Sequence, residues 1–359
     1  MRSGAYSAPA ADEFPVYPAS WYLFCESRAI DSRPLTRNVL GRDLVAFRTA
    51  SGRVAILDAR CSHLGADLGR GRVAGESIQC PFHHWRYGVD GLCVGKPGQA
   101  AIPSFARQAC YPARERHGLL FFFNGPEELF PLPFFDSTDP GDLAPGRVFR
   151  YVADCTWYVN AAHGFDMQHF AAVHDRRLLA PPHIDCPAPY ARRNRYRASV
   201  VGRTVLDRLL RRFAGDTVEI SITTWGGTFF VIEGKFARVR SRFLVVTQPR
   251  RDGTTLCEGI AFGTRRANPL VRGLWGNPSL WVRRVFTYGY LLDETRRLRG
   301  TLYRPQSLVE DDGDMVDFYR WVVSLPQGDT DRRATTPRPL MMPVAGSTAG
   351  VPADFATLT

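Results

Sequence analysis

Short apolar runs separated by turn residues dominate the first third of the chain. They occur at 21–24, 44–47, 54–57 and 118–123, and Gly, Asp, Asn or Pro residues lie between them. Runs of this length between turn residues are typical of β-strands rather than of helices. Residues 119–123 are all apolar, which predicts a buried strand. We therefore expect an all-β domain, and we place its bounds at residues 18–128.

The pattern changes after residues 126–145, which are rich in Pro, Asp and Gly and predict a linker. Helical patterns are predicted at 155–174, 281–302 and 312–325, and strands at 218–230, 238–247 and 255–263. We expect these elements to form a second domain at 145–326, so that the fold class is α+β. Residues 327–359 are rich in Pro, Thr and Gly, which predicts a loosely ordered tail.

Four potential metal ligands form two short pairs inside the β-rich part. The first pair is Cys61 and His63, the second is Cys80 and His83, and sixteen residues lie between them. Two thiolates and two imidazoles are the ligand set of a Rieske [2Fe–2S] cluster, in which each pair of like ligands holds one iron. Each pair lies in a loop that carries Gly or Pro, so backbone amides can turn toward the sulfurs. A zinc knuckle is the alternative, but zinc pairs usually have two to four residues between ligands.

The charge, the cysteines and the apolar runs of the chain indicate which partners and which cellular compartment to expect. The net charge is +11, and only Lys96 and Lys235 among the 46 basic residues are lysines. We interpret the dispersed arginines as a coding bias, or else as a basic face that docks an acidic electron carrier. The chain has no motif of interleaved aromatic and basic residues, so a role in nucleic-acid binding is not expected. No apolar run approaches the ~20 residues of a membrane span, and neither a signal peptide nor a disulfide framework is evident, so we expect a cytoplasmic protein.

A second metal site is predicted in the helical segment at 155–174. His169 and His174 are five positions apart, and a helix end or a local distortion can bring both rings to one metal. Two histidines and one carboxylate form the facial triad of non-haem Fe(II) oxygenases. Asp166 lies three residues before His169 and is suited to orient that ring or to pass an electron.

The carboxylate ligand must come from another part of the chain. The acidic stretch at 307–317 opens the last predicted helix, and the helix dipole alone would favour most of its acids there. We expect Asp312 to be the ligand, because Met315, Val316 and Tyr319 follow it at helical spacing. Asp311 is the alternative. His163 is a competing ligand by its spacing to His169, and otherwise is expected near the substrate pocket.

With these residues in place, the chain resembles the terminal oxygenase (α) component of Rieske non-haem iron oxygenases from about residue 21 to residue 321. The resemblance implies a Rieske domain followed by a helix-grip catalytic domain, in which an antiparallel sheet surrounds a long helix. It also implies a homotrimer in which Asp166 carries electrons from the cluster of one subunit to the iron of its neighbour. Segments 61–69, 78–87 and 90–94 resemble in particular the arylamine N-oxygenases of this family.

The expected function is an O₂-dependent oxidation of an apolar, aromatic or secondary-metabolite substrate. Candidate pocket walls are Trp225, Phe229, Phe230 and Phe243. An arylamine N-oxygenase follows from the resemblance, and a C-hydroxylase, desaturase or oxidative cyclase is the alternative. A Rieske electron carrier without oxygenase activity is the alternative of another class. No G-x-G-x-x-G follows a predicted strand, so NAD(P)H is expected to act only through a partner flavin reductase or ferredoxin.

Overall fold

The computed structural model describes the chain except for residues 1–6, 137, 175, 203–204, 266–276 and 330–359. At 171, 173, 174, 205, 206 and 277 the backbone is described without the side chain. The expected tail at 327–359 therefore lies outside the described residues from 330 onward. Its first residues are held in place, since Gln327 bridges Pro18 and the Gly328 amide donates to the Tyr17 carbonyl at 2.8 Å.

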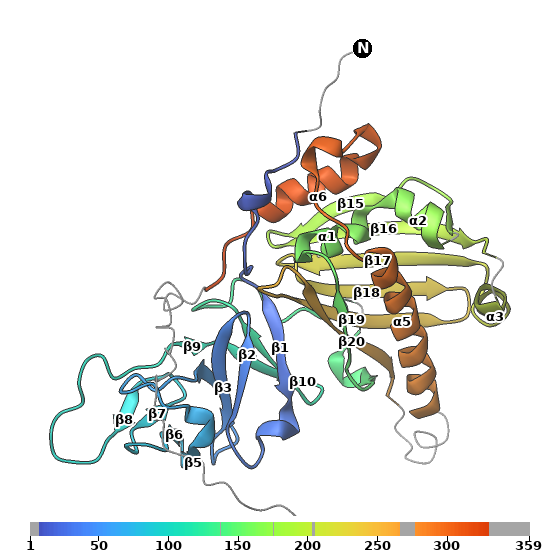
Figure 1. Cartoon of the computed structure of the whole chain (residues 1–359). Coiled ribbons are helices and arrows are strands. Elements are labelled where there is room, and N and C mark those ends of the chain that lie inside the picture. The colour runs from blue at the N-terminus through green and yellow to red at the C-terminus, as the bar shows by residue number, and fades with distance from the viewer. Residues whose placement is uncertain (1–6, 137, 175, 203–204, 266–276, 330–359) are drawn as a thin grey trace, which may run out of the picture. The chain divides into compact units, whose positions relative to one another are not determined.

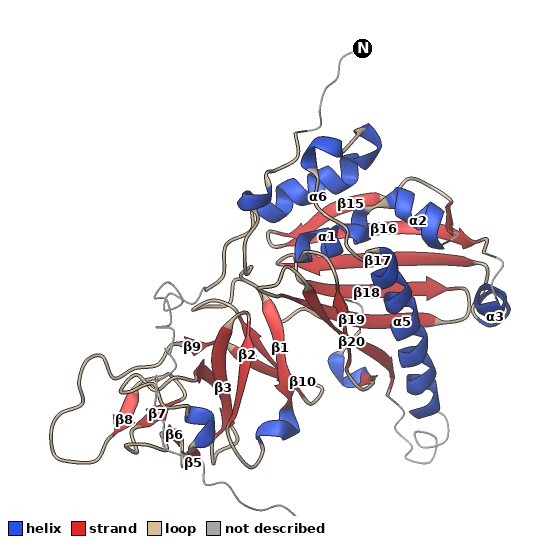
Figure 2. Ribbon diagram, in the orientation of Figure 1, coloured by secondary structure: helices blue, strands red, loops and turns tan. Residues whose placement is uncertain are grey.

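Three small antiparallel sheets form the N-terminal part (Figures 1 and 2). The first has the order β1 (Trp21–Glu26), β11 (Leu119–Phe123), β10 (Ala113–Arg116). The second has the order β2 (Leu35–Val39), β3 (Arg42–Arg48), β4 (Val54–Asp58), β9 (Cys110–Tyr111). The third has the order β5 (Arg72–Ala74), β6 (Ser77–Gln79), β7 (Arg86–Gly88), β8 (Cys93–Gly95). The four strands expected from the apolar runs are present as β1, β3, β4 and β11.

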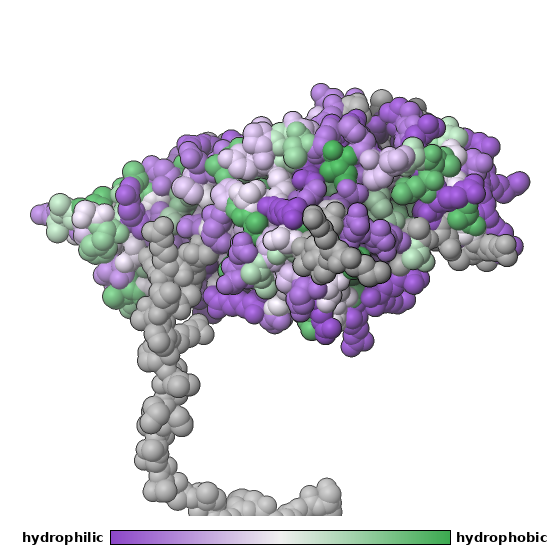
Figure 3. Space-filling view, turned by 90° about the horizontal axis from the view of Figure 1, so that it is seen from above, coloured by the Kyte–Doolittle hydropathy of each residue, from purple (hydrophilic) through white to green (hydrophobic). Residues whose placement is uncertain are grey.

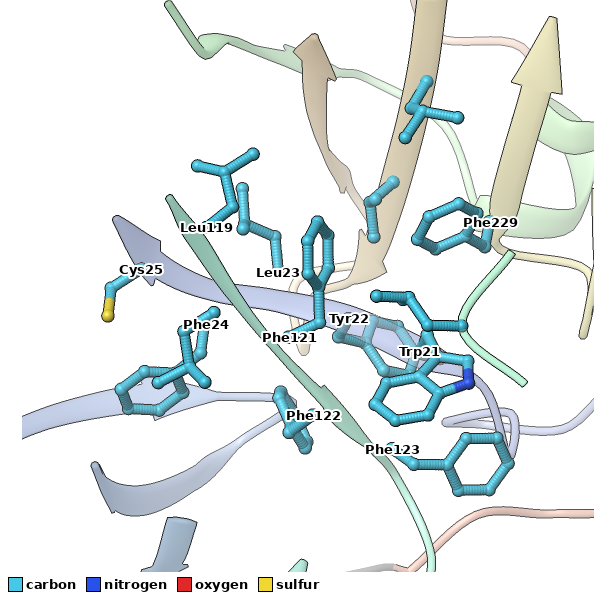
Figure 4. Close-up of a cluster of buried hydrophobic side chains, with 14 of the residues drawn as sticks. Trp21, Tyr22, Leu23, Phe24, Cys25, Leu119, Phe121, Phe122, Phe123 and Phe229 are labelled. Atoms are coloured by element: carbon cyan, nitrogen blue, oxygen red, sulfur yellow. The ribbon is translucent and has the colours of Figure 1, made fainter. Parts of the chain in front are cut away.

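Strand β11 is apolar throughout because both of its faces are covered. The Phe121 ring lies 6.0 Å from Phe229 of β18, whereas Phe122 lies 6.2 Å from Tyr111 of β9. Strand β1 pairs with it in the register Trp21 to Phe123, and the two strands form the centre of a buried cluster (Figure 4). Alternate side chains of one strand thus pack against two different sheets, which explains the absence of a polar face.

The second part is a nine-stranded antiparallel sheet with the order β12-β20-β19-β18-β17-β16-β14, in which β13 pairs with β20 and β15 with β16. The strands are β12 (Leu143–Pro145), β13 (Phe149–Ala153), β14 (Arg176–Leu178), β15 (His183–Ala188), β16 (Ala191–Val200), β17 (Thr217–Trp225), β18 (Phe229–Phe236), β19 (Arg240–Pro249) and β20 (Thr255–Thr264). The helices are α1 (Trp157–Ala162), α2 (Met167–His174), α3 (Val205–Phe213), α5 (Asn277–Arg297) and α6 (Gly313–Val323).

Short 3₁₀ helices complete the described elements: η1 (Ala11–Glu13), η2 (Ser27–Ile30), η3 (Leu68–Arg70), η4 (Pro140–Asp142), η5 (His163–Phe165), η7 (Pro305–Ser307) and η8 (Glu310–Asp312). The long helix α5 packs on β20 and β13 and crosses the sheet (Figure 1). An all-β domain followed by an antiparallel sheet with a long helix confirms the expected α+β fold.

Two predicted elements differ from the structure. Residues 155–174 form α1, η5 and α2 instead of one helix, because Asp166 adopts an extended conformation between them. Its Oδ1 accepts the His169 amide at 2.9 Å, which caps the start of α2. The predicted strand at 218–230 is the hairpin of β17 and β18. Gly226 and Gly227 have φ of +55° and +74°, values that glycine adopts without strain.

The visible surface of the molecule mixes polar and apolar residues (Figure 3). On the face shown in Figure 3, polar side chains predominate and apolar ones are interspersed among them. Within the described part of the chain, no helix has both the length and the apolar character that crossing a bilayer requires.

Candidate functional site

The two predicted pairs of cluster ligands meet between neighbouring loops of the N-terminal part. Cys61 and His63 follow β4, and Cys80 and His83 lie between β6 and β7. Both cysteine side chains are buried, and the two imidazole rings are 4.7 Å apart. The Cys61 amide donates to the Ala66 carbonyl at 2.9 Å, which closes the first loop tightly. The structure therefore brings all four residues together.

The residues present fit an iron–sulfur cluster. His63 Nδ1 is buried and has no hydrogen-bond partner among the residues described, as expected of a nitrogen that binds a metal. Burial raises the pKa of the Cys80 thiol, and the backbone amides of Phe82 and His83 act in the opposite direction because they donate toward its sulfur. The expectation that backbone amides turn toward the sulfurs is confirmed for this loop.

Two side chains from outside it support the first loop. The Tyr87 hydroxyl lies 3.1 Å from Cys61 Sγ and 3.0 Å from the Ser62 hydroxyl. Gln108 accepts the Ser62 amide at 2.9 Å and donates to the carbonyls of residues 58 and 60 at 2.8 Å. Neither Tyr87 nor Gln108 was predicted from the sequence to contact the cluster loops. The position of Tyr87 shortly after His83 was an available signal, whereas Gln108 approaches from a distant part of the chain.

A second group of potential ligands comes from three helical elements of the other part. His163 of η5, His169 of α2 and Glu294 of α5 have ligand atoms that all lie within 4.8 Å of one another. His169 Nε2 is 2.7 Å from Glu294 Oε1, and the rings of His163 and His169 are 5.0 Å apart. Two imidazoles and one carboxylate are a donor set that suits non-haem Fe(II) and leaves coordination positions open.

The neighbours of His163 fix the form of its ring. His163 Nδ1 lies 2.9 Å from the Val159 carbonyl, which can only accept, so Nδ1 carries the hydrogen and Nε2 is the acceptor nitrogen. Burial lowers the pKa of His163, and the Glu294 carboxylate opposes this shift. The ring is therefore held in the neutral form that binds metals.

The segment that carries His163 is anchored from two sides. The amide of Asn194, a fully buried residue of β16, donates to the Gly164 carbonyl at 2.8 Å. The Phe165 ring stacks on Phe318 of α6 at 4.4 Å. The bend between α1 and α2 is thus set by the sheet on one side and by the last helix on the other.

The structure places the other predicted site residues as follows. Asp166 caps α2 from the position just before it, with its carboxylate on the His169 amide. His174 is the last residue of α2, and its side chain lies outside the described residues. Asp312 does not belong to the group of three: Oδ2 accepts the Val309 amide at 2.9 Å and Oδ1 accepts from Gln168 at 3.4 Å. Asp311 is exposed.

Sequence reasoning missed Glu294 although a signal was present. Leu291 and Glu294 lie on α5 and Leu298 directly follows its last residue, all at helical spacing, and Leu291 and Leu298 belong to or contact the buried core. A carboxylate within an apolar helical face needs a partner, because a buried charge without one is costly. Among the acids at the start of α6, Asp312 accepts the Val309 amide, and Asp312 and Asp311 stay predicted ligands that no contact in the structure tests.

An apolar cavity of about 670 Å³ adjoins His163, His169 and Glu294. Of the four predicted pocket walls, Phe230 and Phe243 line it. Phe229 and Trp225 belong instead to the core around β1 and β11. Phe229 and Phe230 are consecutive on β18, so their side chains point to opposite faces of the sheet.

Known proteins resemble this chain in sequence and in fold. The family described as Rieske [2Fe-2S] domain matches residues 20–106. Aminopyrrolnitrin oxygenase of Pseudomonas fluorescens is 41% identical over 182 residues, 48% of this chain and 48% of that protein. The oxygenase component of a 3-ketosteroid-9-alpha-monooxygenase of Rhodococcus rhodochrous is 31% identical over 173 residues, 44% of this chain and 43% of that protein. The matched region thus spans about half the length of these relatives.

The fold likeness extends over more of the chain than the sequence likeness. A solved structure of the QL mutant of NdmA from Pseudomonas putida CBB5 with caffeine has a TM-score of 0.62, at 19% identity, and covers 85% of this chain and 89% of that one. The comparisons thus agree on a Rieske [2Fe-2S] domain at residues 20–106 and on a fold, over most of the chain, that is similar to that of NdmA.

Proposed function

We propose that this chain oxidises an apolar organic substrate with O₂ at a mononuclear iron held by His163, His169 and Glu294. The observation that carries the proposal is the position of this donor set against an apolar cavity, in a chain that also holds a complete set of Rieske ligands. An electron carrier of the same family would need no such cavity beside a second metal site. His174 stays a predicted ligand of the same iron.

The residues around the two metal centres have different roles in this proposal. Iron bound at the second site supplies O₂ activation, and the cluster supplies single electrons. His163, His169 and Glu294 would hold the metal beside the cavity, and the surrounding apolar side chains exclude water from that place. Asp166 caps the helix that carries His169, so its carboxylate touches the backbone of a ligand and is suited to couple that ligand to an approaching cluster.

Two substrate classes are supported by different observations. The likeness to aminopyrrolnitrin oxygenase favours an arylamine, oxidised at nitrogen. The volume of about 670 Å³ favours a polycyclic skeleton, oxidised at carbon by hydroxylation, desaturation or ring closure. A panel of arylamines, indoles and sterols under ¹⁸O₂, with mass spectrometry of the products, separates the two. Label on a carbon skeleton, with none on any arylamine, contradicts N-oxygenation.

The electrons come from outside the chain in this proposal. A flavin reductase, with or without a ferredoxin, passes electrons from NAD(P)H to the cluster, and the α subunits assemble as homotrimers. The purified protein should therefore leave NADH unoxidised until a reductase is added. Turnover of NADH by the protein alone would contradict this part of the proposal.

Iron content tests the oxygenase against the carrier. A colorimetric assay should find about three irons per chain, two in the cluster and one at the second site, with about two inorganic sulfides. About two irons in a fully loaded protein would support the carrier instead.

A further inference from the structure

One charged side chain that lines the cavity, Arg283 of α5, forms no ion pair with any residue that the structure describes. The other charged residues of the lining, histidines aside, each have a nearby partner: Arg176 has Asp207 at 3.1 Å, Glu233 has Arg242 at 2.9 Å and Glu294 has His169 at 2.7 Å. The segment 266–276, which directly precedes α5 and lies outside the described residues, contains no acidic residue. Arg283 therefore brings a positive charge to the cavity without a counter-ion.

The guanidinium group of Arg283 is held beside a second polar side chain of the lining. Its Nη1 donates to the Arg240 carbonyl, and Ser241 is the next residue of β19. Nε and Nη2 of Arg283 and the Ser241 hydroxyl have no partner within the described part of the chain, and none of these atoms is fully buried. Nε and Nη2 form the edge of a guanidinium that binds both oxygens of a carboxylate. The same edge of Arg193 holds Asp185 elsewhere in this chain, at 3.0 and 2.6 Å.

Helix α5 fixes the separation between Arg283 and the proposed iron ligand Glu294 (Figure 1). The two residues are eleven positions apart, which is about three turns, so their side chains leave the same face of the helix. At a rise of about 1.5 Å per residue, they lie about 16 Å apart along the axis. Phe286 and Tyr290 line the cavity between them. A ligand that reaches both residues must therefore be elongated.

The surroundings of Arg283 favour an anionic ligand. Burial lowers the pKa of Arg283, and the positive charge of Arg242 lowers it further. Arginine stays protonated in proteins nonetheless, so the charge is held in a place that disfavours it. A carboxylate on the free edge would offset both effects, whereas a neutral apolar molecule would leave the charge uncompensated.

We propose that Arg283, together with Ser241, binds a carboxylate group of the substrate, whose apolar body extends along α5 toward the iron ligands. The substrate class is then an elongated apolar carboxylic acid that is oxidised far from its acid group. A cavity of about 670 Å³ has room for such a body, polycyclic or long-chain. This inference rests on the proposed function in one respect, that the cavity is the substrate site.

The test compares two fluorescent probes that differ in charge. 4-(1-Pyrenyl)butanoic acid is a carboxylate at neutral pH, and 4-(1-pyrenyl)butanamide has a neutral amide in its place. Fluorescence titrations are done without O₂ on the metal-loaded full-length protein. The wild type should bind the acid about tenfold more tightly than the amide, which is the lower part of the range for charged hydrogen bonds because Arg283 is only partly buried.

Two variants identify the binding residue. Arg283→Gln should bind the acid and the amide with similar affinity. Arg284→Gln is the matched control and should keep the preference: it removes the same charge from the next residue of α5, whose Nε donates to the Arg147 carbonyl at 3.1 Å outside the cavity lining.

Three outcomes overturn the proposal. The first is a wild type that binds both probes equally, prefers the amide or binds neither. The second is an Arg283→Gln protein that keeps the preference for the acid. The third is an Arg284→Gln protein that loses the preference, since then the net charge of the protein and not this site selects the acid.

A measurement on the wild type alone guards against misfolding of the variant. Phenylglyoxal modifies accessible guanidinium groups, and peptide mapping by mass spectrometry should show that the acid protects Arg283 and that the amide does not. An Arg283 that is unreactive without a ligand, or equally reactive with either probe, contradicts the proposal.

Binding without O₂ also separates this inference from the proposed function. A preference for the acid without any oxidised product under ¹⁸O₂ would contradict the oxygenase while supporting the role of Arg283. Labelled products without the preference would do the reverse.

Discussion

Replacing Glu294 with glutamine is expected to remove the mononuclear iron and to leave the cluster intact. The side chain is 14% exposed, and its Oε1 lies 2.7 Å from His169 Nε2. Glutamine keeps the size of the side chain but removes the negative charge. Because loss of a residue that only supports a metal ligand already costs about 10–100-fold in affinity, loss of the ligand itself should exceed about 100-fold, or about 2.7 kcal/mol.

Two control variants make the result specific. Asp293 is the neighbouring acid, but it is 53% exposed and pairs with Arg297 at 3.1 Å on the surface of α5, so Asp293→Asn should keep its iron. Asp312→Ala should also keep its iron. It removes the acceptor of the Val309 amide, which should cost about 0.5–2 kcal/mol in the free energy of unfolding, as for other helix caps.

Colorimetric iron, acid-labile sulfide and the EPR signal of the reduced cluster measure the outcome. The wild type should contain about three irons per chain, and Glu294→Gln should contain about two with an unchanged cluster signal. Full iron content in Glu294→Gln would refute the assignment. Loss of one iron in Asp312→Ala would instead support the carboxylate chosen from the sequence.

Three further predictions follow from single contacts. Tyr87→Phe removes the hydroxyl that lies 3.1 Å from Cys61 Sγ. Hydrogen bonds to the sulfur stabilise the reduced cluster, so loss of one worth about 1 kcal/mol should lower the cluster potential by about 40 mV. Protein-film voltammetry measures the potential, and an equal or higher value contradicts this prediction. Asp166→Asn preserves a good helix cap, so the stability of the protein and the binding of both metal centres should persist. Turnover should nearly stop if the carboxylate takes part in electron transfer, and activity close to that of the wild type would exclude that role. The hydrogen bond from Arg193 holds the pKa of Asp185 below its usual value, so the ionised carboxylate stabilises the folded state above its unfolded pKa and this effect is lost as the pH falls. The difference in unfolding free energy between wild type and Asp185→Asn should therefore shrink between about pH 5 and pH 3 in urea titrations, and a pH-independent difference would refute it.

The sequence by itself determined the features that depend on short stretches of chain. Cys61 and His63, like Cys80 and His83, are so close in sequence that one loop positions each pair, and the structure brings the four together. Four strands of the N-terminal part, β1, β3, β4 and β11, were likewise predictable, because a short apolar run between turn residues has few ways to bury itself. Helix α5 was expected from its spacing of apolar residues, although it begins and ends a few residues earlier than predicted.

Only the tertiary structure decided which distant side chains share the second site. Helical spacing can show that Asp312 or Glu294 turns toward the core, but not which helix approaches His169. That depends on how α5 packs on β13 and β20. The inclusion of His163 depends on the bend at η5, which Asn194 and Phe318 hold from outside the segment. The distinction between Phe229 and Phe230 depends on which face of β18 meets the other domain. Each of these outcomes is set by contacts between residues far apart in the sequence, and local patterns do not encode them.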